Sequence, residues 1–99
     1  MPKFKIAPSP IHGNGVFATH IIEIGETIGL AIKLKYFIMP HITDSLGKWI
    51  NHSDNPNSVL ILNPFQGGHV LASIDRILPG TEIVADYTDT PWYIEKSFK

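Results

Sequence analysis

The sequence contains no cysteine, which excludes disulfide bonds and zinc sites built from thiolates. Charged residues make up only 17% of the chain, the net charge is −1, and no basic block occurs, so direct binding to nucleic acid has little electrostatic support. No apolar run reaches the length of a membrane span, and the N-terminus lacks a signal-peptide pattern. These absences predict a soluble intracellular protein, in the cytoplasm or nucleus of the host cell, without membrane contact.

The composition that remains is typical of a folded protein whose chain turns often. Hydrophobic residues make up 43% of the 99 residues, which predicts a single domain over 1–99. Eight glycines and eight prolines separate short runs rich in Ile and Val, and no stretch keeps a helical period for three turns. We therefore expect a mainly β chain with one helical turn around Asp44–Trp49, capped by Asp44 or Ser45. The expected strands lie in the runs Phe4–Ile6, Val16–Ala18, Thr27–Leu34, Val59–Leu62, Val70–Ile74 and Glu82–Ala85.

Two parts of the chain resemble each other. The pattern Pro, apolar, any, Gly, any, any, Val, apolar, Ala, hydroxyl occurs over 10–19 and again over 64–73, and a second match relates 22–28 to 77–83. Either glycine-rich turns match by chance, or two similar turn–strand–turn–strand units pack about a pseudo-twofold axis. In the second case the pair would be the folding unit, since neither half alone can bury its apolar face.

Three short motifs carry side chains or backbone suited to binding. Gly13-Asn14-Gly15 allows a ligand to approach the backbone closely, although an ordinary turn needs the same residues. The run 51–57 offers directional donors and acceptors next to Trp49 and Ile50, although Asn, Ser and Asp also favour a solvated turn. The run 82–87 alternates like a strand that ends on an acidic residue and a tyrosine.

Taken together and in this order, the motifs resemble those of the SET-domain lysine methyltransferases. They are Gly-x-Gly over 13–15, Asn-His-Ser-x-x-Pro-Asn over 51–57 and Glu-Ile-x-x-Asp-Tyr over 82–87, and the resemblance covers roughly Lys3 to Trp92. It implies the SET-domain β-clip fold of short curved sheets, with a C-terminal pseudoknot. It also implies an enzyme that transfers a methyl group from S-adenosylmethionine to a lysine side chain of a protein or peptide, histone tails being the family's usual target.

The resemblance also assigns roles to single residues. Tyr87 would be the catalytic tyrosine, and Tyr36 is the nearest candidate for a second tyrosine at the substrate. Ala85 stands where the family often has an aromatic residue that limits methylation, so its small side chain predicts the addition of more than one methyl group. The residues expected to contact the cofactor are His12, Gly13, Asn14, Gly15, Asn51, His52 and Trp92.

The expected chemistry needs neither a strong base nor a metal ion. The attacking lysine has a free pKa of about 10.4, and an apolar channel beside a positive sulfonium disfavours its ammonium form. The five histidines are scattered without the close spacing of zinc ligands, so no metal site is expected. The histidines expected at turns or on the surface are His20, His41 and His69.

The sequence departs from the family in several places. The stretch from Leu30 to Asn51 is short, a Tyr-x-Gly motif and a cysteine-rich zinc segment are missing, and Lys48 replaces an arginine. These gaps suggest a minimal SET protein, similar to those of some viruses and bacteria, in which a homodimer would complete the substrate groove. The alternative functions are a catalytically impaired SET-fold binding module or scaffold, and a purely structural β-clip domain without a cofactor.

Overall fold

Short strands dominate the computed structural model, which describes residues 3–35 and 39–86. All six runs that were expected to be strands form strands, with bounds that shift by a few residues. Two further strands were missed, because one contains a proline and the other has only two residues. The elements are β1 (Phe4–Pro8), β2 (Asn14–Ala18), β3 (Thr27–Lys35), β4 (Met39–Ile42), the 3-10 helix η1 (Gly47–Trp49), β5 (Asn51–His52), β6 (Ser58–Asn63), β7 (Gly68–Ser73) and β8 (Glu82–Ala85).

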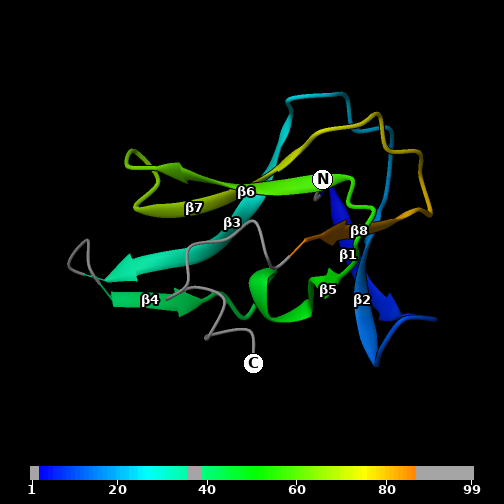
Figure 1. The fold of residues 1–99 in the computed structure, drawn as a ribbon, viewed down its shortest axis with the longest axis horizontal. Coiled ribbons are helices and arrows are strands. Elements are labelled where there is room, and N and C mark those ends of the chain that lie inside the picture. The colour runs from blue at the N-terminus through cyan, green and yellow to red at the C-terminus, as the bar shows by residue number, and fades with distance from the viewer. Residues whose placement is uncertain (1–2, 36–38, 87–99) are drawn as a thin grey trace.

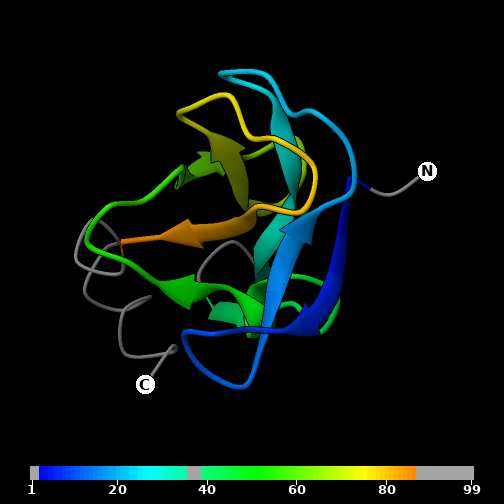
Figure 2. The ribbon, with the colours of Figure 1, turned by 90° about the vertical axis from the view of Figure 1, so that its right-hand side faces the viewer.

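The strands form one open, bent sheet. Their order is β1-β2-β8-β6-β7-β3-β4, and β5 pairs with β8 outside this path. Figure 1 shows β1 and β2 at one end, β3, β4, β6 and β7 at the other, and β8 between them. The two groups run in different directions in Figures 1 and 2, so the sheet bends at β8. The chain is therefore mainly β, as expected.

The single helical turn lies where it was expected, but its predicted cap is wrong. η1 covers three residues, and Leu46 occupies the N-cap position without a side-chain hydrogen bond. Thr43 stabilises the turn instead: its Oγ1 accepts a hydrogen bond from the Gly47 N–H at 2.9 Å and donates one to the Leu30 carbonyl at 2.8 Å. Thr43 caps the turn in place of Asp44 and Ser45 because its hydroxyl also bonds to β3, a contact that the local sequence does not reveal.

The pseudo-twofold arrangement is confirmed at Ile22 and Ile77, which occupy equivalent positions in the two repeats. Each donates its N–H to the carbonyl of the other, at 2.9 and 2.8 Å. Such a reciprocal pair between equivalent residues is what a local twofold axis requires. Both side chains are almost fully buried, so the axis passes through the core of the molecule.

Hydrogen bonds around this axis repeat with an offset of 55 residues. The Gly25 N–H donates to the Ser73 carbonyl and the Gly80 N–H to the Ala18 carbonyl, both at 2.9 Å. Both glycines turn the chain in the left-handed region, with φ of 82° and 85°. Strand pairing joins the repeats in the same way. β2 of the first repeat pairs with β8 of the second, and β3 of the first repeat pairs with β7 of the second. The two halves therefore form one folding unit.

One hydrophobic core joins the two halves. Its buried members come from both repeats and from the segment between them, and Phe4, Trp49 and Leu60 pack against it from the edge. None of the helices formed by residues 3–35 and 39–86 has the length and apolar character needed to cross a membrane. The buried members are Val16, Ala18, Ile22, Ile28, Ala31, Ile32, Leu46, Ile50, Leu71, Ile77, Ile83 and Ala85.

Candidate functional site

The side-chain amide of Asn51 joins two of the sequence motifs. Asn51 begins β5, and its Nδ2 lies 3.1 Å from the His12 carbonyl oxygen and 3.3 Å from that of Asn14, in the turn between β1 and β2. The same nitrogen lies 3.1 Å from Ser9 Oγ and 2.8 Å from Glu82 Oε2 at the start of β8. The Gly-x-Gly turn, the Asn-His motif and the last described strand therefore meet at one amide.

Ser9 and Glu82 complete this arrangement, which we call the Ser9–Asn51–Glu82 network. The Ser9 hydroxyl donates to Glu82 Oε1 at 2.7 Å and accepts the N–H of Ile11 at 3.0 Å. No role at the site was predicted for Ser9 or Glu82. The three members are separated by 31 to 73 residues along the chain, so no local pattern relates them.

The two glycines of the turn are needed for different reasons. Gly13 has φ of 47° and open space around it, so its backbone conformation is what favours glycine. A Cβ at Gly15 would collide with the Glu82 carboxylate and lie 3.0 Å from the Ser9 Cβ, so any other residue here would displace that carboxylate. Within the described part of the chain, the N–H groups of His12 and Gly13 make no hydrogen bond, and both residues are exposed. The turn thus presents two donors that suit a carboxylate.

Asn57 positions β8 by hydrogen bonds that imitate those of a neighbouring strand. Its Nδ2 donates to the Glu82 carbonyl at 2.8 Å, and its Oδ1 accepts the N–H of Val84 at 2.9 Å. The buried Ser58 hydroxyl donates to the Val84 carbonyl at 2.7 Å. The loop that follows β5 therefore fixes the path of β8 toward residue 87. Asn57 belongs to the Asn-His motif, but this contact with β8 was not predicted.

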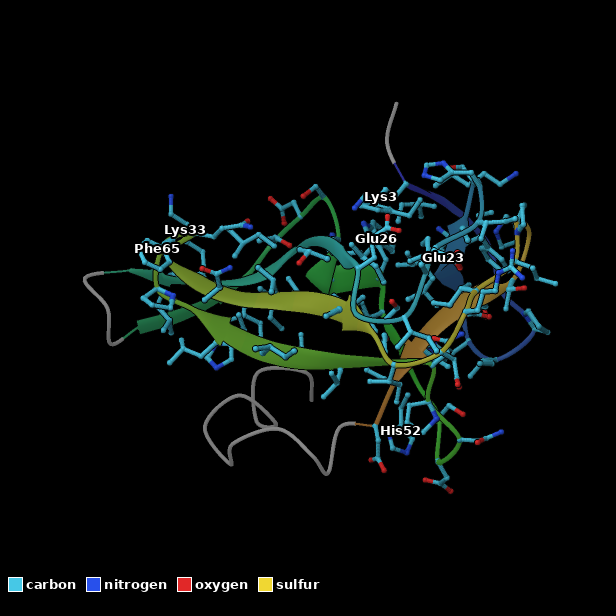
Figure 3. The ribbon with its side chains drawn as sticks, turned by 90° about the horizontal axis from the view of Figure 1, so that it is seen from above. Lys3, Glu23, Glu26, Lys33, His52 and Phe65 are labelled. Atoms are coloured by element: carbon cyan, nitrogen blue, oxygen red, sulfur yellow. The ribbon has the colours of Figure 1, made fainter. Side chains whose placement is uncertain are left out.

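His52 lies beside two carboxylates. Its Nε2 is 3.0 Å from Asp54 Oδ1, and its Nδ1 is 3.8 Å from Asp86 Oδ1. Each of the three offers a possible ligand atom, and these atoms lie within 4.8 Å of one another, a grouping common on protein surfaces without an ion. In Figure 3, His52 lies on the opposite side of the molecule from Lys3 and Glu26. The spacing of the histidines does not predict this group, because Asp86 follows β8 and is far from His52 in the sequence.

Several expected site residues lie outside the described residues. These are Tyr36, Tyr87 and Trp92, together with the C-terminal segment expected to form the pseudoknot. Ala85 is described and is 2% exposed, within the hydrophobic core. It pairs with His52 in the parallel register of β5 and β8. The proposed determinant of methylation degree thus lies directly opposite the histidine of the Asn-His motif.

His69 corrects the expectation that it lies at a turn or on the surface. It lies in β7, every residue of which is buried, and it is 5% exposed. Its Nδ1 is buried without a hydrogen-bond partner, and burial lowers the pKa of His69 below its ordinary value. The expectation failed because β7 is covered on both faces. His20 and His41 are exposed, as expected.

Glu26 has the other clearly shifted pKa among the described residues. A hydrogen bond from the Lys3 side chain, with the two groups 2.9 Å apart, lowers the pKa of Glu26, and the N–H of Glu23 adds to the effect. Figure 3 shows Lys3 and Glu26 side by side. This ion pair joins Lys3, just before β1, to Glu26, just before β3, so its role is structural.

A pocket of about 600 Å³ lies away from the Gly-x-Gly turn. It is lined by Ile24, Pro56 and Leu78 among others, and by the side chains of Asp75 and Arg76. Asn55, Pro56 and Asn57 of the loop after β5 line it, but neither the turn nor Asn51 does. It therefore does not coincide with the cofactor position that the motifs imply.

Comparison with known proteins gives a likeness of fold. No protein-family model and no curated protein sequence matches the chain. A crystal structure of a Plasmodium falciparum protein named as a histone methyltransferase matches with a TM-score of 0.67 and 18% sequence identity, over 94% of this chain and 98% of that one. At this identity the likeness shows the fold alone. It agrees with the mainly β, SET-type fold expected from the motifs.

Proposed function

We propose that this chain is a methyltransferase that uses S-adenosylmethionine to methylate a lysine side chain of a protein or peptide. The observation that carries the proposal is the convergence of three separated segments on the Asn51 amide: the turn 12–15, the loop 51–57 and β8. The same segments carry the motifs that resemble the SET-domain enzymes. The fold shared with the Plasmodium protein is consistent with this function.

The groups at this site fit the methionine part of the cofactor. The exposed N–H groups of His12 and Gly13 suit its carboxylate. Because Asn51 Nδ2 is directed toward the turn and Glu82, its Oδ1 occupies the other side of the amide and makes no hydrogen bond to the described residues. That oxygen can accept a hydrogen bond from the cofactor's ammonium group. When bound, the cofactor supplies an electrophilic methyl group on a sulfonium.

The protein's own contribution to catalysis is positioning. Hydrogen bonds from Asn57 and Ser58 hold β8, whose chain continues through Asp86 to Tyr87, the proposed catalytic residue. Alignment of a lysine amine with the methyl group supplies much of the rate, and oxygen atoms around the methyl group add weak C–H···O contacts. Desolvation of the amine favours its neutral form, so no separate base is required.

Two finer features belong to the same proposal. Ala85 is small where the SET-domain enzymes often have an aromatic residue, so products with more than one added methyl group are expected, and a monomethylated end product would contradict this. A second copy of the chain is proposed to complete the substrate groove, because the stretch from Leu30 to Asn51 is short. Sedimentation over a range of protein concentrations tests this: a concentration-dependent dimer supports it, and a monomer at all concentrations contradicts it.

The activity itself is tested by incubating the protein with S-adenosylmethionine and a lysine peptide array, with products identified by mass spectrometry. We expect a mass gain of one or more methyl groups on lysine. The Tyr87→Phe variant should reduce turnover about 100-fold, as expected when one group that acts on the reacting atoms is removed. Phe65→Leu, at an exposed aromatic residue of the turn between β6 and β7, is the control and should retain turnover. Cofactor binding without any methyl transfer would favour the scaffold function instead.

A further inference from the structure

Glu82 carries a negative charge that no basic group of the described residues balances. Among residues 3–35 and 39–86, the ion pairs are those of Lys3 with Glu26, of Arg76 with Glu23, and of His52 with its two carboxylates. Glu82 instead accepts hydrogen bonds from two neutral groups, the Ser9 hydroxyl and the Asn51 amide. Glu82 is only half-buried, so its carboxylate stays in contact with solvent.

The charge is directed at the Gly-x-Gly turn. The Glu82 carboxylate lies against the Cα of Gly15, where a Cβ would collide with it. It also lies 2.8 Å from the amide nitrogen of Asn51, whose oxygen is proposed to contact the cofactor. A fixed carboxylate beside a small binding site attracts a cationic ligand more strongly than a neutral one of the same shape.

We infer that Glu82 determines specificity by favouring the methyl donor over its demethylated product. This inference rests on the proposed function. Methyl transfer forms a nitrogen–carbon bond and breaks the sulfur–carbon bond, and the bonding electron pair stays on sulfur. S-adenosylhomocysteine therefore has one positive charge fewer than S-adenosylmethionine and is otherwise alike. The carboxylate of Glu82 acts on the ammonium and carboxylate groups that both ligands carry, and the opposite charges of these two groups largely cancel. It stabilises the donor further through the sulfonium charge, which promotes release of the product.

The substitution Glu82→Gln removes the charge and preserves the hydrogen bonds. A glutamine can accept from Asn51 through its oxygen and donate to Ser9 through its nitrogen, so the network retains its shape. Glu23→Gln is the matched control, because it removes the same charge from an exposed carboxylate that belongs to a repeat turn. Thermal unfolding of each variant without ligand checks that the fold is retained.

The test is calorimetric titration of the wild type and both variants with each ligand at low salt. We expect Glu82→Gln to weaken S-adenosylmethionine about fivefold, which corresponds to roughly 1 kcal/mol, and to change S-adenosylhomocysteine less than about twofold. Glu23→Gln should change neither. An equal loss for both ligands, or no loss for either, would overturn the inference while leaving the proposed function standing.

A second measurement needs no variant and applies if Glu82→Gln does not fold. The preference of the wild type for the donor over the product is measured at low salt and at about 1 M salt, where charge interactions at a half-buried site are screened within roughly 3 Å. The preference should shrink several-fold at high salt, and a preference independent of salt would contradict the role of Glu82. If the wild type binds neither ligand, the proposed function fails and this inference with it.

Discussion

At the scale of single residues, Asn51 is the side chain on which ligand binding at the candidate site depends most. Its amide bonds to the turn, to Ser9 and to Glu82, so one side chain holds both the shape of the turn and the direction of its own carbonyl oxygen. We predict that Asn51→Ala weakens S-adenosylmethionine binding about tenfold or more, because several hydrogen bonds are lost at once. Calorimetry measures the change. Gln66→Ala, at an exposed position in the turn between β6 and β7, is the control and should bind like the wild type; equal affinity of Asn51→Ala would refute this role.

His69 gives a residue-scale prediction about pH. Burial lowers the pKa of His69 in the folded protein, so the unfolded chain binds a proton more readily as the pH falls below about 6.5. The free energy of unfolding should therefore be highest above that pH and decrease as the pH falls through this range. Urea unfolding at several pH values measures the slope. His69→Leu should flatten it, whereas His41→Leu, at an exposed position, should not. The same slope in wild type and His69→Leu would disprove the explanation.

At the scale of elements, β8 depends on side chains as much as on neighbouring strands. Its pairings with β2, β5 and β6 each cover only one or two residues, and Asn57 supplies two further hydrogen bonds to its backbone. We predict that Asn57→Ala lowers the free energy of unfolding by about 1–3 kcal/mol, because two backbone groups of β8 lose their partners. Urea unfolding measures the loss, with Asn55→Ala as the neutral control. A change in the free energy of unfolding below about 0.5 kcal/mol would contradict this role of Asn57, because water would then satisfy the two backbone groups of β8 equally well.

The elements also show what can be predicted from the sequence and what cannot. Ile- and Val-rich runs between glycines and prolines located six strands, because buried strands and turns each have a local composition. β5 was missed since its two residues are held by β8, and the cap at Thr43 was missed since it depends on β3. The motifs identified Asn51 and the turn, but the partners Ser9 and Glu82 depend on contacts across 31 to 73 residues. His69 was misplaced because no pattern shows that β7 is covered on both faces.

At the scale of the whole molecule, the strand pairs formed between the two repeats make each repeat depend on the other for its stability. Gly25 and Gly80 are equivalent, with φ of 82° and 85° and with matching hydrogen bonds of 2.9 Å. We predict that Gly25→Ala and Gly80→Ala each lower the free energy of unfolding by about 1–2 kcal/mol, because a Cβ is strained in this conformation. Thermal or urea unfolding should show one cooperative transition for both variants. A large loss for one glycine and none for the other, or two separate transitions, would contradict the pseudo-twofold account.

The central claim is that the turn 12–15, the loop 51–57 and β8 form a cofactor site, and calorimetric titration of the wild-type protein with S-adenosylmethionine tests it most directly. The titration is repeated over a wide range of protein concentrations, so that binding is separated from any association of the proposed dimer. The account predicts saturable binding of about one ligand per chain. Absence of binding at millimolar ligand would contradict it, and the chain would then have the fold and the motifs without a working cofactor site.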